Sequence, residues 1–286
     1  MSEERHPDHS RCGSTDAPPF ASGESGIVAG VRANVRTRLQ DAALDARRVA
    51  TLEPWRLHRA ARAAPPRRRV LVLGIERTDR ENLMAPARAE LLRSRHDVEV
   101  ATTDVGGRGK WENLNLLLAD HPAQGRDWLL VIDDDVDLPR GFLDDFLFLA
   151  ERFGLRMAQP AHRRRSHAAW RVTRRRGGSV VRETGFVEIG PISAFHADTF
   201  ETLLPFPDLR AGWGLDAHWA ALAHAREWPI GVVDATPIRH VLRPIADSYK
   251  REEALAEARA YLAGRPQVSA AEAQRTTATH RGWRTP

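Results

Sequence analysis

Four aspartates stand close together in the stretch LLVIDDDVDLP, residues 129–139, directly after an apolar run. Carboxylates crowded in a partly desolvated cleft need a counter-charge, or one of them must take up a proton. A divalent cation is the simplest counter-charge, and hard oxygen ligands suit Mg²⁺ or Mn²⁺, which commonly share their coordination with substrate phosphates. On an extended backbone Asp133 and Asp135 point to one side and Asp134 to the other. The stretch therefore indicates either a metal–phosphate site on Asp133 and Asp135, or solvated aspartates that end a strand.

Two further features could complete such a site. The segment GGRGKWENLN, residues 106–115, places Lys110 between a glycine-rich turn and a helical pattern. Exposed backbone N–H groups and a lysine can hold a diphosphate, although an ordinary strand–helix turn has the same composition. His240, in PIRHV, is either a third metal ligand or a packed, hydrogen-bonded histidine.

The pentapeptide GWGLD, residues 212–216, offers an aromatic ring and a carboxylate from one turn. Trp213 could pack against the C–H face of a sugar ring, as aromatic rings pack against other apolar groups. Asp216 could act as a site carboxylate or could cap the helix that follows, and both roles are compatible.

The elements around these residues alternate between strand and helix patterns. This alternation predicts an α/β fold with a mostly parallel central sheet and helices on both faces. Ligands bind such sheets beyond the carboxyl ends of the strands, which is where Asp133, Asp134 and Asp135 fall. The expected strands of this part are 70–75, 97–102, 127–133 and 156–161, and the expected helices are 81–95, 110–120 and 141–154.

The pattern changes after residue 160. An arginine-rich segment, residues 161–183, is interpreted as a solvated, mobile loop, with contact to an anionic acceptor as the alternative. Beyond it we expect strands at 186–190, 192–195, 230–235 and 237–242, helices at 197–204, 217–227 and 247–263, and a loose end from residue 276.

The amino-terminal part has a different composition. Residues 1–24 are rich in Ser, Gly, Pro and charge, which is typical of disorder. Between residues 27 and 52 apolar residues recur every four positions, at Ile27, Val31, Val35 and Leu39. This pattern favours a helix that packs on its own domain, with a membrane-surface helix as the alternative. We therefore divide the chain into an extension, residues 1–67, a catalytic-type domain, residues 68–245, and a carboxyl-terminal helix with a tail, residues 246–286.

Composition limits the partners. The formal net charge is +5 and the pI is about 10.2, but no basic stripe with interleaved aromatic residues occurs, so nucleic acid is not an expected partner. No apolar run approaches the roughly 20 residues of a membrane span, although peripheral contact with a membrane stays open. Cys12 is the only cysteine and the first residues lack a secretory signal, so we expect a cytoplasmic location.

In their order along the chain, these motifs resemble a GT-A-type nucleotide-sugar glycosyltransferase. That fold carries an Asp-x-Asp (DxD) motif at the end of a central strand, a later Gly-Trp-Gly-x-Asp and a late histidine. The segments AQPA, FVEIGPISAF, GWGLD and GVVDATPIRH further resemble the GT-A-like domain-of-unknown-function family numbered 707, over roughly residues 68–245.

The resemblance implies a role for each matching residue. Asp133 and Asp135 would bind the metal and the donor diphosphate, with Asp134 beside them, and His240 would be the third metal ligand. Asp216 would be the general base. Donor contacts are implied for Asp104, Lys110, Asn115 and Trp213.

The predicted function is metal-dependent transfer of a sugar from a nucleotide diphosphate donor to an acceptor hydroxyl, with inversion expected from direct displacement. Mn²⁺ or Mg²⁺ is the expected cofactor. The acceptor could be a glycan, a lipid-linked sugar or a small molecule. The alternatives are a catalytically lapsed GT-A-like domain that binds a sugar nucleotide or a partner protein, and a nucleotidyltransferase.

Overall fold

The structure is a computed structural model, and it describes residues 18, 20, 22, 31–240, 242 and 250–284 of the 286-residue chain. The disorder predicted for residues 1–24 therefore lies almost wholly outside the described residues, as does Ile27. None of the helices formed by the described residues is long and apolar enough to cross a bilayer.

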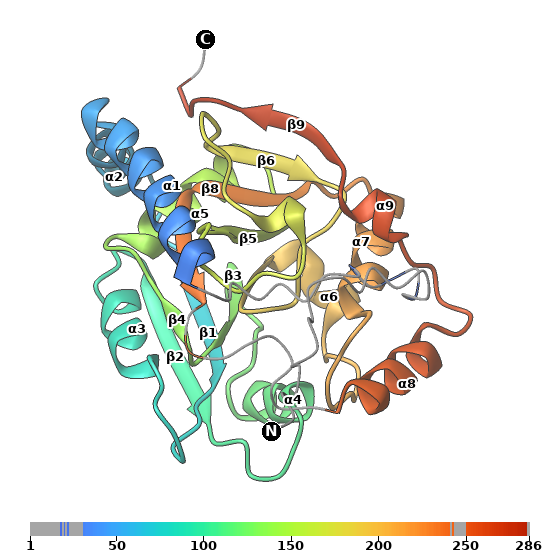
Figure 1. The fold of residues 1–286 in the computed structure, drawn as a ribbon. Helices are drawn as coiled ribbons and strands as arrows, with labels where there is room; N and C mark the ends of the chain where they lie inside the picture. The colour runs from blue at the N-terminus through green and yellow to red at the C-terminus, as the bar shows by residue number, and fades with distance from the viewer. Residues whose placement is uncertain are drawn as a thin grey trace, which may run out of the picture.

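A single mixed sheet organises the chain, in the order β2-β1-β3-β7-β5-β8-β6-β9, with β4 paired to β8 (Figure 1). The strands are β1 (Arg69–Ile75), β2 (Asp97–Thr103), β3 (Trp128–Asp133), β4 (Val136–Asp137), β5 (Met157–His162), β6 (Val181–Thr184), β7 (Ile192–His196), β8 (Ile230–His240) and β9 (Thr276–His280). The α-helices are α1 (Val31–Ala50), α2 (Glu53–Ala63), α3 (Met84–Leu91), α4 (Lys110–Asp120), α5 (Phe142–Arg152), α6 (Phe200–Leu203), α7 (Leu215–Ala225), α8 (Arg251–Leu262) and α9 (Ala270–Ala273).

Strand directions follow from the pairings. β1 is parallel to β2 and β3, and β7 is antiparallel to both β3 and β5, so β5 points the same way as β3. β8 is parallel to β5, and β6 lies antiparallel between β8 and β9. Six of the eight strands in the order (β2, β1, β3, β5, β8, β9) therefore point one way, and β7 and β6 point the other.

Alternate residues of the central strands enter two different cores. Leu71 and Val131 face a cluster that includes residues of α4 and α7, whereas Val72 and Leu130 face a cluster that includes residues of α2, α3 and α5. Period-two alternation on a doubly covered strand produces this division. The predicted α/β class, with a mostly parallel sheet and helices on both faces, is confirmed.

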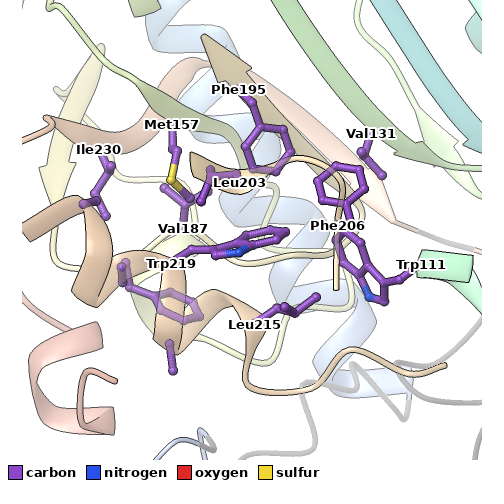
Figure 2. Close-up of a cluster of buried hydrophobic side chains, with 14 of the residues drawn as sticks. Trp111, Val131, Met157, Val187, Phe195, Leu203, Phe206, Leu215, Trp219 and Ile230 are labelled. Carbon is purple, nitrogen blue, oxygen red and sulfur yellow. The ribbon is translucent and has the colours of Figure 1, made fainter. Parts of the chain in front are cut away.

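An aromatic cluster joins α4 to α7 beneath the sheet (Figure 2). The Trp111 ring lies edge-on to Phe206 at 5.0 Å and to Trp219 at 5.4 Å between ring centroids. All three side chains are buried. Such pairs add about 0.5–1.5 kcal/mol each beyond the area they bury. The cluster thus fixes the relative positions of the two helices that carry Lys110 and Asp216.

Four predictions about elements are wrong. The two strands predicted at 230–235 and 237–242 are one strand, β8, which continues through Pro237. Residues 186–190 are not a strand, because their backbone turns toward side chains such as Gln159, whose Oε1 accepts the Glu188 N–H. The arginine-rich segment contains β6 and is largely buried rather than a mobile loop. The tail from residue 276 is not loose, since residues Thr276–His280 form β9 on the free side of β6.

Candidate functional site

The three consecutive aspartates after β3 have three different partners. Asp133 Oδ1 lies 2.6 Å from Lys110 Nζ, and the carboxylate keeps 29% of its exposure. Asp134 is buried and accepts the Arg77 backbone N–H at 2.7 Å. Asp135 is buried, and its Oδ2 lies 2.9 Å from His240 Nε2. Two of the carboxylates thus contact the basic side chains that the sequence singled out.

Lys110 reaches Asp133 from the first turn of α4. Gly109 precedes it as the N-cap in an extended conformation and donates its N–H to Glu112. A Cβ at Gly109 would lie 2.3 Å from the Arg210 backbone, so only glycine fits there. The ammonium also donates to the Ile189 carbonyl at 3.3 Å. Lys110 therefore bridges the end of β3 and the segment before β7.

His240 ends β8 opposite Val136 of β4, which places it beside the aspartates. The backbone N–H of His240 donates to Ser166 Oγ at 2.9 Å, and its backbone carbonyl accepts from the His167 N–H at 3.1 Å. Burial disfavours the charged imidazole, but the hydrogen bond and charge of Asp135 outweigh that effect and raise the pKa of His240. The histidine is thus held from both its backbone and its ring.

Sequence reasoning missed two buried groups beside His240. His162 Nε2 lies 3.5 Å from Glu188 Oε2, and His162 Nδ1 lies 3.2 Å from Ser166 Oγ. His162 reaches this position because the pairing of β5 with β8 shifts register after Pro160. Burial lowers the pKa of His162, so the ring favours its neutral form. The signal for Glu188 was a single acid inside the otherwise apolar run FVEIG.

Asp216 lies in the first turn of α7, after the N-cap Gly214, so it is not itself the cap. It is buried and accepts the backbone N–H of Ala217 at 2.9 Å. Burial, and then the negative charge of Glu188, raise the pKa of Asp216 to about 7. A carboxyl with such a pKa changes charge near neutral pH, as a general base requires.

The turn before α7 is held by α8. Glu257 accepts the backbone N–H groups of Arg210, Ala211 and Gly212, at 2.7, 3.0 and 2.8 Å. Gly212 has a φ of +75°, and a Cβ there would lie 1.8 Å from Trp111 Nε1. Glu257, which sequence reasoning also missed, therefore fixes the approach of Asp216 to the site.

The remaining predicted site residues have other contacts. Asp104, exposed after β2, accepts from Thr78 Oγ1 at 2.5 Å. The amide of Asn115 donates to the Phe206 carbonyl at 2.8 Å and accepts the Phe206 N–H at 3.0 Å, which ties α4 to the loop after α6. Trp213 is half-buried against the aromatic cluster. Donor contacts for these three residues stay predictions.

Three buried polar atoms around the site have no hydrogen-bond partner among the described residues: Gln159 Nε2, His167 Nδ1 and His240 Nδ1. His162 Nε2 and Glu188 Oε2 have only their 3.5 Å contact with each other. Such atoms are rare in proteins, and a cluster of them indicates a place for a ligand, water or ion. Carboxylate oxygens and imidazole nitrogens are suitable donors for Mn²⁺. Within the described ranges, however, no three His, Cys, Asp or Glu side chains already surround a common point for a metal. The donor types fit the predicted metal, while Asp133 is paired with Lys110 instead.

No known family's model matches this chain, and no curated protein matches it. The resemblance to family 707 thus finds no support in that comparison. Matches occur among solved structures. One is A197 from STIV, with 13% identity and a TM-score of 0.44, over 62% of this chain and 87% of that one.

Two other matching structures carry ligands. GalNAc-T7, solved with UDP, GalNAc and Mn²⁺, shows 10% identity and a TM-score of 0.45, over 68% of this chain and 48% of that one. Glucosyl-3-phosphoglycerate synthase from Mycobacterium tuberculosis, solved with Mn²⁺, uridine-diphosphate and phosphoglyceric acid, shows 18% identity and a TM-score of 0.43, over 71% of this chain and 78% of that one. At these identities and scores the likenesses carry no conclusion about the site of this chain.

Proposed function

We propose that this chain is a metal-dependent glycosyltransferase that moves a sugar from a nucleotide diphosphate to an acceptor hydroxyl. One observation carries the proposal. Asp133 and Asp135, at the carboxyl end of β3, contact Lys110 and His240, and Lys110 reaches the segment next to Glu188, whose charge acts on the buried Asp216. Acids, a lysine and a titratable carboxyl thus gather where α/β sheets bind ligands.

The charges define which group could hold which part of the donor. Asp133, Asp135 and His240 would hold a divalent cation, which when bound neutralises charge on the leaving diphosphate. Lys110 would exchange its contact with Asp133 for the diphosphate oxygens, and so keep a positive charge beside the leaving group. Gln159 Nε2 would donate a hydrogen bond to the sugar or the acceptor, and Glu188 Oε2 would accept one.

Asp216 would supply the base. Its carboxylate takes the proton of the acceptor hydroxyl while that oxygen attacks the anomeric carbon. The bond from the anomeric carbon to the diphosphate oxygen breaks, and its electron pair leaves with the nucleoside diphosphate. A single displacement of this kind inverts the anomeric centre. The pKa of about 7 leaves Asp216 charged, and therefore able to accept a proton, above neutral pH.

The ion pair of Lys110 with Asp133 favours a second candidate, a domain that binds sugar nucleotides without turnover. A lysine on the first aspartate supplies in the protein the positive charge that a cation would otherwise bring. This candidate predicts donor binding that does not depend on a metal.

Calorimetry with a panel of sugar nucleotides, with and without Mn²⁺, tests both candidates. Asp135→Ala should abolish Mn²⁺-dependent donor binding. Asp137→Ala is the matched control, because Asp137 is exposed and paired only at the surface with Arg239, and it should leave the affinity unchanged. Thermal melts establish that the variants are folded.

Binding that is equally tight without metal, and unchanged in Asp135→Ala, would refute the metal hypothesis. Metal-dependent binding followed by release of the nucleoside diphosphate supports the transferase. Binding with no release, across the acceptors offered, supports the second candidate.

A further inference from the structure

Helix α1 is amphipathic, but its apolar face points outward and its polar face points toward the fold. Its outward face carries Val35, Leu39, Ala42, Ala46 and Val49, at steps of four, three, four and three residues. The larger side chains on this stripe are exposed: Val35 by 51%, Leu39 by 66% and Val49 by 63%. A surface helix normally turns such a stripe toward the core. Within the described part of the chain, α1 therefore leaves its apolar face unpartnered.

The inward face of α1 is polar and tightly bonded. Asp41 accepts the backbone N–H groups of Arg164 and Arg165, at 3.0 and 2.9 Å. Asp45 accepts from the guanidinium groups of Arg163 and Arg175, both at 2.7 Å. Rotating the helix to bury its apolar stripe would break all four contacts. The orientation is therefore set by the fold, and the exposed stripe is a consequence of it.

The apolar surface continues into α2, and arginines surround it. Leu52 and Trp55 are exposed by 54% and 60%. Between residues 31 and 63, the exposed ionised side chains are all arginines. Asp45 and Glu53 are paired with guanidinium groups, and the buried Asp41 accepts two backbone N–H groups. The exposed arginines are Arg32, Arg36, Arg38, Arg47, Arg56, Arg59 and Arg62. An apolar stripe bordered by positive charge is complementary to an anionic bilayer surface.

A pocket of about 480 Å³ lies on the other side of α1 from the stripe, against Leu44, Arg48 and Thr51, and we call it the arginine pocket. Its volume lies within the usual range for small-molecule sites. Both acids in its wall are occupied, Glu53 by Arg48 at 2.8 Å and Asp234 by Arg182 at 2.7 Å. The arginines that line it are Arg47, Arg48, Arg56, Arg175, Arg176, Arg281 and Arg284.

One arginine of this pocket has an unused donor. Arg175 is 1% exposed, its Nη1 is bonded to Asp45, and its Nη2 is buried with no hydrogen-bond partner among the described residues. A buried guanidinium nitrogen without an acceptor is costly, and a phosphate oxygen satisfies it well.

We propose that the α1–α2 face docks on an anionic membrane, with the apolar stripe at the headgroup–acyl boundary and the bordering arginines against the lipid headgroups. The arginine pocket lies on the opposite side of α1 and takes no part in this contact. A second copy of the chain fits the stripe by spacing alone, but it would bring the two sets of arginines together. The proposal does not depend on glycosyl transfer, and it gives the enzyme proposed above access to acceptors or donors at a membrane surface.

Co-sedimentation of the full chain with vesicles tests this proposal. The chain should bind vesicles containing phosphatidylglycerol and not vesicles of phosphatidylcholine alone, and added salt should weaken the binding. Leu39→Glu should lower the partition coefficient about tenfold or more, since a leucine leaves the bilayer boundary and a like charge enters. Leu92→Glu is the matched control: Leu92 is 55% exposed, lies outside this face, and its substitution should have no effect.

The arginine pocket is tested separately. Arg176→Ala removes an exposed side chain that lines the pocket, and it should leave binding to anionic vesicles unchanged because the pocket faces away from the stripe. Arg93→Ala, on a surface-exposed side chain elsewhere, is the control. A fivefold or larger loss of vesicle binding in Arg176→Ala, with Leu39→Glu unaffected, would place the membrane contact at the pocket and contradict the assignment to the stripe.

Three results would overturn the assignment to a membrane. The first is that the unaltered chain binds neutral and anionic vesicles equally well, and that Leu39→Glu binds both as well as the unaltered chain does. The second is a melting shift with inorganic phosphate or glycerol phosphate but no binding to vesicles, which would make the pocket a site for a soluble anion. The third is a dimer in light scattering that Leu39→Glu dissociates, in the absence of vesicle binding.

Discussion

Replacing Asp216 with asparagine should change how the stability of this protein depends on pH. The folded chain holds the carboxyl in its neutral form up to about pH 7, because burial raises its pKa from 3.8 to about 7. The unfolded chain loses that proton near pH 3.8. Between these values the unfolded state binds fewer protons than the native state, so the free energy of unfolding falls as the pH rises, and it levels off above about pH 7.

The size of the effect follows from the shift. A difference of roughly three pKa units corresponds to about 4 kcal/mol over the full range, at about 1.4 kcal/mol per unit. Between about pH 5 and about pH 8 the change is about 3 kcal/mol, because part of the loss already occurs below pH 5. Asp216→Asn has no charge to bury, so its stability relative to the unaltered protein should improve by that amount over the same interval.

Urea unfolding at both pH values, followed by tryptophan fluorescence, measures this difference. Burial also raises the pKa of Asp145 to about 7, and comparing variant with parent at each pH cancels that contribution. Asp120→Asn, at an exposed position of α4, reports the effect of the substitution itself. A change of less than about 1 kcal/mol in the difference between variant and parent would refute the reasoning. In an assay of transfer, the variant should keep donor binding and lose turnover.

Two further substitutions test the packing that supports the site. Asp234→Ala should cost about 3–5 kcal/mol of stability in urea unfolding, because it leaves the fully buried Arg182 without its carboxylate; a loss under about 1 kcal/mol would show that the pair is not desolvated. Leu57→Ala should cost about 2–5 kcal/mol, because Leu57 of α2 is fully buried in the core shared with α5. Trp55→Ala, on the exposed side of the same helix, is its control, and equal losses for the two variants would contradict the packing of α2.

The first half of the fold could be predicted because its signals are local. Apolar runs such as residues 70–75 are covered on both faces, so composition alone identifies them as strands. The predicted helix 110–120 coincides with α4, where Gly109 and Glu112 form the cap at one end. Local pattern, burial and capping all agree in these segments.

The second half depends on partners that no local pattern reveals. β9 consists of Thr276, Thr277, Ala278, Thr279 and His280, and it is a strand only because β6 offers a free edge. The predicted helix of residues 27–52 has the right periodicity, yet Asp41 and Asp45 turn its polar face inward. Truncation before residue 60 would remove Leu57 from the core, although the sequence places that residue in the extension of residues 1–67.

Some residues of the candidate site could also be predicted from the sequence, and others could not. Asp133, Asp135, Lys110 and His240 were identified from residue type and position, and they lie in contact as two pairs. Their pairing as acid with base was not predictable, because it depends on which side chains face each other across the sheet. His162, Glu188 and Glu257 were missed because each has its effect through a residue distant in sequence.

The register of β8 against β4 limits where the sequence can gain or lose residues. His240 lies opposite Val136, and its neighbour Arg239 lies opposite Asp137. Because alternate residues of a strand face opposite sides, gaining one residue before Arg239 would bring that arginine to Asp135 in place of the imidazole, and losing one residue would move His240 to the other side. The irregular pairing around Asp234 can absorb length changes, whereas the three residues after Pro237 cannot. Homologues that keep this contact should therefore show no insertion or deletion between Pro237 and His240.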